Sequence, residues 1–200
     1  MISPLDQFLE TAGVLHVAPD GQMAPGDRCP PPRVLLPGSF NPIHHGHWGL
    51  AERAADLCGE PAAFELSVAN VDKPSLTINE IRRRVAQFQE RGSIWLTHAP
   101  RFVDKAACFP GVTFLVGADT ALRIVMPCYY EADETRMLAA LHSIAERGCR
   151  FLVACRVDIR GQWLRLTDLP IPPSARGLFE EIPPECFRCD VSSTELRARG

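Results

Sequence analysis

Long apolar runs are absent from this sequence of 200 residues. No segment approaches the roughly 20 consecutive apolar residues that a membrane-spanning helix requires. The opening residues MISPLDQFLE also lack the basic end and apolar stretch of a secretory signal. We therefore expect a soluble, cytoplasmic protein that does not bind a membrane.

An excess of basic charge is also missing. The formal net charge is −3 at pH 7, and the sequence pI is about 6.1. Proteins that bind nucleic acid usually carry a broad basic surface. We therefore expect no nucleic-acid partner, and any positive charge that matters for function must be local.

Paired cysteine motifs are scarce, although the chain contains eight cysteines. Cys186 and Cys189 have the C-x-x-C spacing of a metal or redox site, but no second pair accompanies them. Disulfides are rare in cytosolic proteins. We expect most of these thiols to be free and to pack as small hydrophobic groups.

What the sequence does contain is an alternation of short apolar runs and amphipathic segments, with a hydrophobic content of 46%. Such alternation is typical of an α/β fold with a parallel sheet and helices on both faces, because parallel strands need crossover connections. Strands are predicted at residues 34–36, 63–68, 94–96, 112–116, 151–157 and 185–188, with a local pairing at 162–166. Helices are predicted at residues 4–13, 46–58, 77–92, 102–108, 120–126, 137–147 and 192–199.

Proline and glycine are concentrated before the first predicted strand of this sheet. Residues 18–32 contain DG, PG and PPP, which indicate a loop or linker. We therefore divide the chain into an N-terminal helix and linker over residues 1–32 and one folded domain over residues 33–200.

Residues 37–50 read PGSFNPIHHGHWGL and directly follow the first predicted strand. Gly38 allows a close backbone turn, and His44 and His47 share a face because they lie three residues apart at a helix start. Free amides at a helix N-terminus bind anions. The segment predicts a phosphate-binding corner, with helix capping by a histidine as the alternative, and His45 is expected at the surface.

A second segment with similar chemistry lies at residues 191–197, VSSTELR. Ser193 and Thr194 place hydroxyls and amides at a predicted helix start, and Arg197 adds a positive charge one turn later. The alternative is an ordinary helix capped by Ser192. Ligands bind beyond the carboxyl ends of parallel strands, so residues 37–47, 117–120 and 191–197 are expected to converge.

GSFNPIHHGH and the distant VSSTELR resemble the H-x-G-H and I-S-S-T-x-x-R signatures of the nucleotidylyltransferase superfamily. Within it, the chain is most similar to the nicotinamide or nicotinate mononucleotide adenylyltransferase branch. The resemblance implies a Rossmann-like nucleotidylyltransferase domain over residues 33–200. It also implies transfer of AMP from ATP to a mononucleotide-like acceptor, with release of pyrophosphate and a role in NAD biosynthesis.

The same resemblance implies roles for individual residues. It assigns catalysis to His44, His47, Lys73 and Arg197, and acceptor binding to Trp95 and Lys73. Magnesium accompanies ATP, with few direct protein ligands, as befits a sequence without a carboxylate cluster. The nucleotide-binding residues that it implies are Gly38, Ser39, Phe40, His44, His47, Gly117, Asp119, Ser192, Ser193, Thr194 and Arg197.

Plain structural roles stay open for several of these residues. Asp119 is also placed to cap the following helix, Lys73 to be solvated in a loop, and Trp95 to pack in the core. We expect Lys105 at the surface of its helix.

The sequence also departs from the branch that it resembles, because it has no clear counterpart of the segment that recognises the nicotinamide ring. The acceptor and the choice between ATP and CTP therefore stay open. A cytidylyltransferase, another adenylyltransferase and a catalytically silent nucleotide-binding regulatory module are the alternatives. A homo-oligomer is also among the expectations.

Overall fold

The computed structural model describes residues 2–11, 13–69, 74–157 and 163–183. Within them, a sheet of eight strands confirms the α/β fold with a Rossmann-like, mostly parallel sheet. The strands of this sheet are β1 (Leu15–Val17), β2 (Met23–Pro25), β3 (Val34–Pro37), β4 (Ala62–Ser67), β5 (Ile94–Thr97), β6 (Thr113–Gly117), β7 (Arg150–Ala154) and β10 (Phe179–Glu181).

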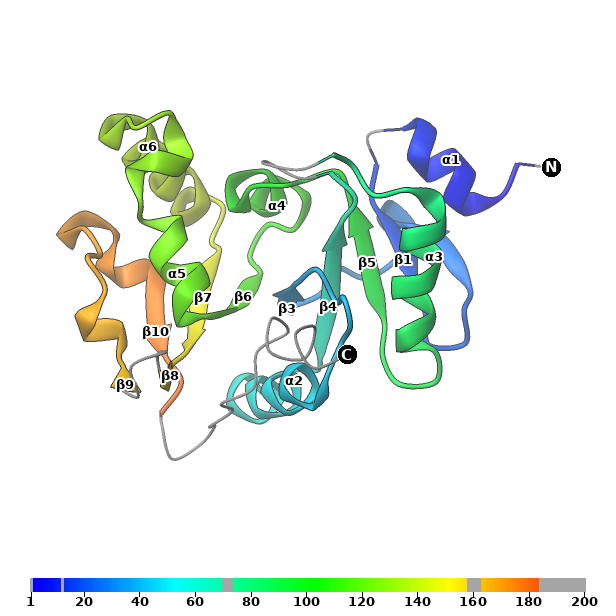
Figure 1. Cartoon of the computed structure of the whole chain (residues 1–200), viewed down its shortest axis with the longest axis horizontal. Coiled ribbons are helices and arrows are strands. Elements are labelled where there is room, and N and C mark those ends of the chain that lie inside the picture. Colours follow the sequence, from blue (N-terminus) through cyan, green and yellow to red (C-terminus); the bar gives the residue numbers. More distant parts are fainter. Residues whose placement is uncertain (1, 12, 70–73, 158–162, 184–200) are drawn as a thin grey trace.

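The strand order is β10-β7-β6-β3-β4-β5-β1-β2. Neighbouring strands from β10 to β5 are parallel, whereas β1 is antiparallel to both β5 and β2. The chain builds from β3 toward β5 on one side and from β6 toward β10 on the other (Figure 1). The order therefore reverses between β3 and β6, where Val34 pairs with Thr113 and Leu35 with Phe114.

Helices cover both faces of the sheet, as predicted (Figure 1). Leu50 of α2 and Ile81 of α3 belong to one hydrophobic cluster, and Ala121 of α5 and Leu141 of α6 belong to the other. Among the described residues, no helix combines the length and apolar character that a bilayer crossing requires. The helices are α1 (Pro4–Glu10), α2 (His45–Cys58), α3 (Ile78–Val85), α4 (Phe102–Cys108), α5 (Ala118–Ile124) and α6 (Glu134–Glu146).

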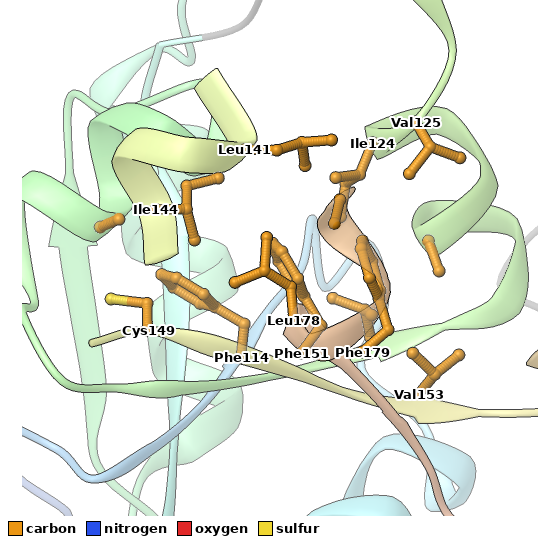
Figure 2. Close-up of a cluster of buried hydrophobic side chains, with 14 of the residues drawn as sticks. Phe114, Ile124, Val125, Leu141, Ile144, Cys149, Phe151, Val153, Leu178 and Phe179 are labelled. Carbon is orange, nitrogen blue, oxygen red and sulfur yellow. The ribbon is translucent and has the colours of Figure 1, made fainter. Parts of the chain in front are cut away.

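The core beneath α5 and α6 is organised by aromatic rings on neighbouring strands (Figure 2). Phe151 lies in register with Phe114 on one side and Phe179 on the other. Its ring stacks on both, with centroids 5.7 Å from Phe114 and 4.9 Å from Phe179. Aromatic pairs of this kind add about 0.5–1.5 kcal/mol beyond the area they bury. The row of rings thus ties β6, β7 and β10 together.

The opposite face has its own aromatic cluster, which reaches outside the sheet. Phe40, in the loop after β3, packs edge-on against Phe64 of β4 and Phe88, with centroids 5.7 and 5.1 Å away. Its side chain is only 1% exposed. The loop that follows β3 is therefore anchored in the core.

The segment before residue 33 differs from the prediction. Leu15 pairs with both Pro25 and Leu96, so β1 and β2 form a hairpin on the edge of the main sheet. The prediction of a linker over residues 18–32 is wrong for β2 and for the short 3-10 helix Gly26–Arg28. Pro25 does not prevent the strand, since an edge strand tolerates proline.

Several other helices and strands begin or end at residues that differ from those predicted. Thr77 caps α3 with Glu80 as predicted, but α3 ends at Val85 and continues only as the 3-10 helix Ala86–Phe88 rather than to Gly92. Strand β7 stops at Ala154, and the predicted local pairing is confirmed as β8 (Arg156–Val157) with β9 (Trp163–Leu164). Strand β10 lies where irregular chain was expected. The strand predicted at 185–188 and the helix at 192–199 lie outside the described residues.

Lys105 of α4 is buried, which corrects the prediction of a surface lysine. Its Nζ donates to both carboxylate oxygens of Glu65 at 2.8 Å and to the Ala99 carbonyl at 2.7 Å. The Thr97 hydroxyl donates to the same carboxylate at 2.6 Å. Buried charges persist when they are paired and fully hydrogen-bonded. This network links β4, β5 and α4.

We predict that Lys105→Met destabilises the protein by about 3–5 kcal/mol, because it leaves the Glu65 carboxylate buried without its partner. The free energy of unfolding in urea measures this loss. The double variant Glu65→Gln/Lys105→Met should recover most of it, and Arg82→Met on the exposed side of α3 is the control. A loss below about 1 kcal/mol for Lys105→Met would show that the pair is not structurally important.

Candidate active site

The predicted phosphate segment and the Gly117–Asp119 region lie next to each other in the structure. The first follows β3 and the second follows β6, and these two strands are neighbours where strand order reverses. Crevices at such points bind ligands in open α/β sheets. Two of the three segments expected to converge are thus adjacent, whereas Lys73, Ser192, Ser193, Thr194 and Arg197 lie outside the described residues.

His44 and His47 contact each other at the start of α2. His44 is the N-cap residue, and its backbone N–H donates to Nδ1 of His47 at 3.2 Å. The ring centroids are 3.8 Å apart. His47 therefore caps the helix and also shares a face with His44. Capping leaves room for the predicted contact with phosphate, which stays a prediction. Because Nδ1 accepts a hydrogen bond, a neutral His47 carries its proton on Nε2 and presents a donor there.

Burial controls the charge of these rings. It lowers the pKa of His47 to about 4, assisted by the nearby positive charge of His44 when protonated. It also lowers the pKa of His44, with a smaller contribution from His45, which is exposed as predicted. Both site rings are therefore neutral near pH 7. Each neutral ring can offer one N–H donor to an anion, and a nearby negative charge would raise the pKa of the ring.

The tight turn of the loop is made by a different residue from the one predicted. Gly38 continues the ladder of β3, since its N–H donates to the Glu65 carbonyl at 2.9 Å. Phe40 has the left-handed backbone, with φ of 45°. Gly38 is needed for another reason: a Cβ there would lie 2.6 Å from Cε1 of Phe40. Because the Phe40 side chain is buried, only its backbone is left to meet a nucleotide.

The loop is also held by side chains that the sequence did not reveal. Arg84 and Gln87, from α3 and the 3-10 helix that follows, hydrogen-bond to its backbone, and Arg83 bonds to Asn41. These partners lie more than 40 positions apart in sequence, and no local pattern indicates the contact. The RRR run at 82–84 is visible in the sequence but does not say what it touches.

Asp119 lies in the first turn of α5, and its side chain is exposed. The N-cap of α5 is Gly117, so the prediction that Asp119 caps the helix is wrong. A carboxylate in the first turn favours the helix through its dipole. Its predicted contact with a ribose stays a prediction.

Trp95 is buried on the opposite face of the sheet from α2. It packs edge-on against Phe109 at 5.5 Å and lies 4.6 Å from the ring of His16. Trp95 also lines a cavity of about 810 Å³, together with residues of α1 and the β1–β2 hairpin. Core packing thus accounts for Trp95, and the structure does not place it beside His47.

The described part of the chain holds no group of three or more histidine, cysteine, aspartate or glutamate residues that could bind a metal. Its cysteines are free thiols, namely Cys29, Cys58, Cys108, Cys128, Cys149 and Cys155. Cys186 and Cys189 lie outside the described residues.

Comparison with known proteins agrees with this arrangement. The model of the family described as cytidylyltransferase-like matches residues 35–199. A phosphopantetheine adenylyltransferase from Parasynechococcus marenigrum is 40% identical over 57 residues, which are 28% of this chain and 32% of that protein. The match thus spans about a third of the length of that relative.

We predict that His47 titrates near pH 4 and lowers the stability of the protein as pH falls. The unfolded chain takes up a proton near pH 6.5, whereas the folded chain does so only near pH 4. Stability should therefore fall between these two pH values. NMR of the imidazole rings measures the pKa, and urea unfolding at pH 7 and pH 5 measures stability. The drop should shrink in His47→Asn, and a ring that titrates near 6.5 would contradict the assignment.

Proposed function

The chain belongs to the cytidylyltransferase-like family, and from this premise we propose that it is a nucleotidylyltransferase acting on small molecules. It transfers the AMP part of ATP to a phosphate-bearing acceptor and releases pyrophosphate. The observation that supports this most directly is the His44–His47 pair, held at the start of α2 where strand order reverses.

The residues suit a displacement at phosphorus. An oxygen of the acceptor phosphate attacks the α-phosphorus of ATP in line, the bond to the bridging oxygen breaks, and pyrophosphate leaves. Catalysis of this kind is mainly positioning and electrostatic stabilisation. His47 offers Nε2–H, and α2 offers the positive end of its dipole, to the oxygens that gain charge. No covalent nucleophile is required.

Further groups complete the proposed site. We propose that Ser192, Ser193, Thr194 and Arg197 hold the β- and γ-phosphates, that Lys73 faces the phosphates, and that Asp119 meets the ribose. Magnesium bound to ATP neutralises phosphate charge. These assignments rest on the motifs that match the superfamily.

Two acceptors are proposed. Nicotinamide or nicotinate mononucleotide, which makes the product NAD or its acid form, follows from the motif resemblance. Phosphopantetheine is favoured by the local identity to a phosphopantetheine adenylyltransferase. The base is proposed as adenine, with CTP as the alternative that the family description suggests.

We predict pyrophosphate release only when a nucleotide and its matching acceptor are present together. The assay combines ATP or CTP with nicotinamide mononucleotide, nicotinate mononucleotide, phosphopantetheine or a sugar phosphate, and each product is identified by mass spectrometry. One pair should exceed all others by about tenfold or more, as a site that hydrogen-bonds its substrate discriminates strongly. Nucleotide binding without release for any pair would instead support a regulatory module.

We predict that His47→Asn lowers kcat by about 10²-fold or more, because a donor to developing charge is lost. An asparagine oxygen can still accept the His44 N–H and keep α2 capped, so the thermal midpoint should change little. His45→Asn, at the exposed neighbouring position, should retain full turnover. Turnover of His47→Asn within about threefold of the parent would remove His47 from the mechanism.

A further inference from the structure

We infer that Gln87 and Arg84 are positioning residues that turn the peptide groups of the loop after β3 toward a bound phosphate. We name this loop, residues 38–43, the phosphate loop. The inference rests on the proposed function. Neither side chain is assigned a contact with substrate. Each acts through the backbone that it holds.

Gln87 bonds both ends of the turn at once. Its Oε1 accepts the N–H of Ile43 at 3.0 Å, and its Nε2 donates to the carbonyl of Phe40 at 3.0 Å. Nε2 also donates to the carbonyl of Arg84 at 3.2 Å, which fixes the amide plane. One side chain therefore sets the spacing between residues 40 and 43. A shorter or apolar side chain cannot replace these bonds.

Arg84 holds Ser39, the residue before Phe40, and adds a positive charge next to the loop. Its Nη1 donates to the Ser39 carbonyl at 2.9 Å, although its side chain is only 8% exposed. The ion pair with Glu80 is long, at 3.8 Å, and the Glu80 side chain is partly exposed. Arg83 adds a bond of 2.7 Å from Nη2 to Oδ1 of Asn41. The positive charge of Arg84 thus lies directly behind the phosphate loop.

Peptide geometry converts these bonds into a direction for the amides. In a trans peptide unit, the carbonyl and the next N–H point in opposite directions. The carbonyls of Ser39 and Phe40 both point to side chains of the α3 region. The N–H groups of Phe40 and Asn41 therefore both point away from it. Successive amides turned to one side around a left-handed residue form an anion-binding concavity.

Charge and hydrogen bonding reinforce this arrangement. A donor on a carbonyl polarises the peptide unit, and so strengthens the N–H at its other end. Arg84 does this for the unit that ends in the Phe40 N–H. Gln87 does it for the unit that ends in the Asn41 N–H. Arg84 of α3 and Gln87 of the 3-10 helix that follows it therefore orient the peptide groups of the phosphate loop. His47 lies nearby at the start of α2.

The test compares Gln87→Met with Gln89→Met, which changes an exposed glutamine two residues away. Calorimetry with inorganic triphosphate measures anion binding, and thermal unfolding defines a temperature at which every variant is folded. Gln87→Met should weaken triphosphate binding by about tenfold or more, as one or two lost hydrogen bonds predict. Gln89→Met should stay within about twofold. Unchanged affinity in folded Gln87→Met would overturn the inference.

A second pair covers the case in which Gln87→Met does not fold. Arg84→Lys keeps the charge but loses the planar fork, and Arg82→Lys is its exposed control. Arg84→Lys should weaken triphosphate binding by about threefold to tenfold, with Arg82→Lys unchanged. Equal affinities for both variants would contradict the role of Arg84.

The unmodified protein supplies an independent measurement. On addition of triphosphate, the amide proton of Phe40 should shift downfield more than that of Ile43, which already bonds to Gln87. No shift at Phe40 would overturn the inference. Weaker triphosphate binding in Gln87→Met, together with no turnover on any acceptor, would instead refute the proposed function and leave the positioning role intact.

Discussion

The burial of the Phe40 ring is the constraint on which the candidate site depends. The ring lies among Phe64, Phe88 and His47, with its centroid 5.3 Å from that of His47. It occupies the space where a Cβ on Gly38 would stand, which explains the glycine. It also helps bury His47, and burial is the main cause of the lowered pKa. One aromatic side chain thus couples the hydrophobic core to the geometry of a surface loop.

Apolar packing and hydrogen bonds hold different parts of this loop. Apolar contacts hold Phe40, whereas the donors and acceptors of Gln87 and Arg84 set the orientation of its peptide groups. A loop held by packing alone would be free to rotate its amides. Because these contacts come from Arg84 of α3 and from Gln87 and Phe88 of the 3-10 helix that follows it, the connection between β4 and β5 helps to shape the candidate site.

Charged residues are buried elsewhere for a different purpose. Glu65 and Lys105 satisfy one another together with Thr97 and the Ala99 carbonyl, on the face of the sheet away from α2. Arg84, in contrast, donates one hydrogen bond to the Ser39 carbonyl, and its ion pair with Glu80 is long. A closed network stabilises the fold. Arg84 has fewer hydrogen-bonding partners, so its positive charge can still attract an incoming anion.

Local sequence determined the alternation of strands and helices, the start of α2 beside two histidines, the Thr77–Glu80 cap and the motif pair that indicates the superfamily. These depend on periodicity and on residues within a few positions of each other. Tertiary structure alone decided that β1 and β2 join the sheet edge, that Lys105 is buried, that Trp95 faces away from His47, and that Phe40 rather than Gly38 makes the turn. It also brought Arg84 and Gln87 to the phosphate loop. Each of these depends on partners tens of residues away, and no local pattern encodes such contacts.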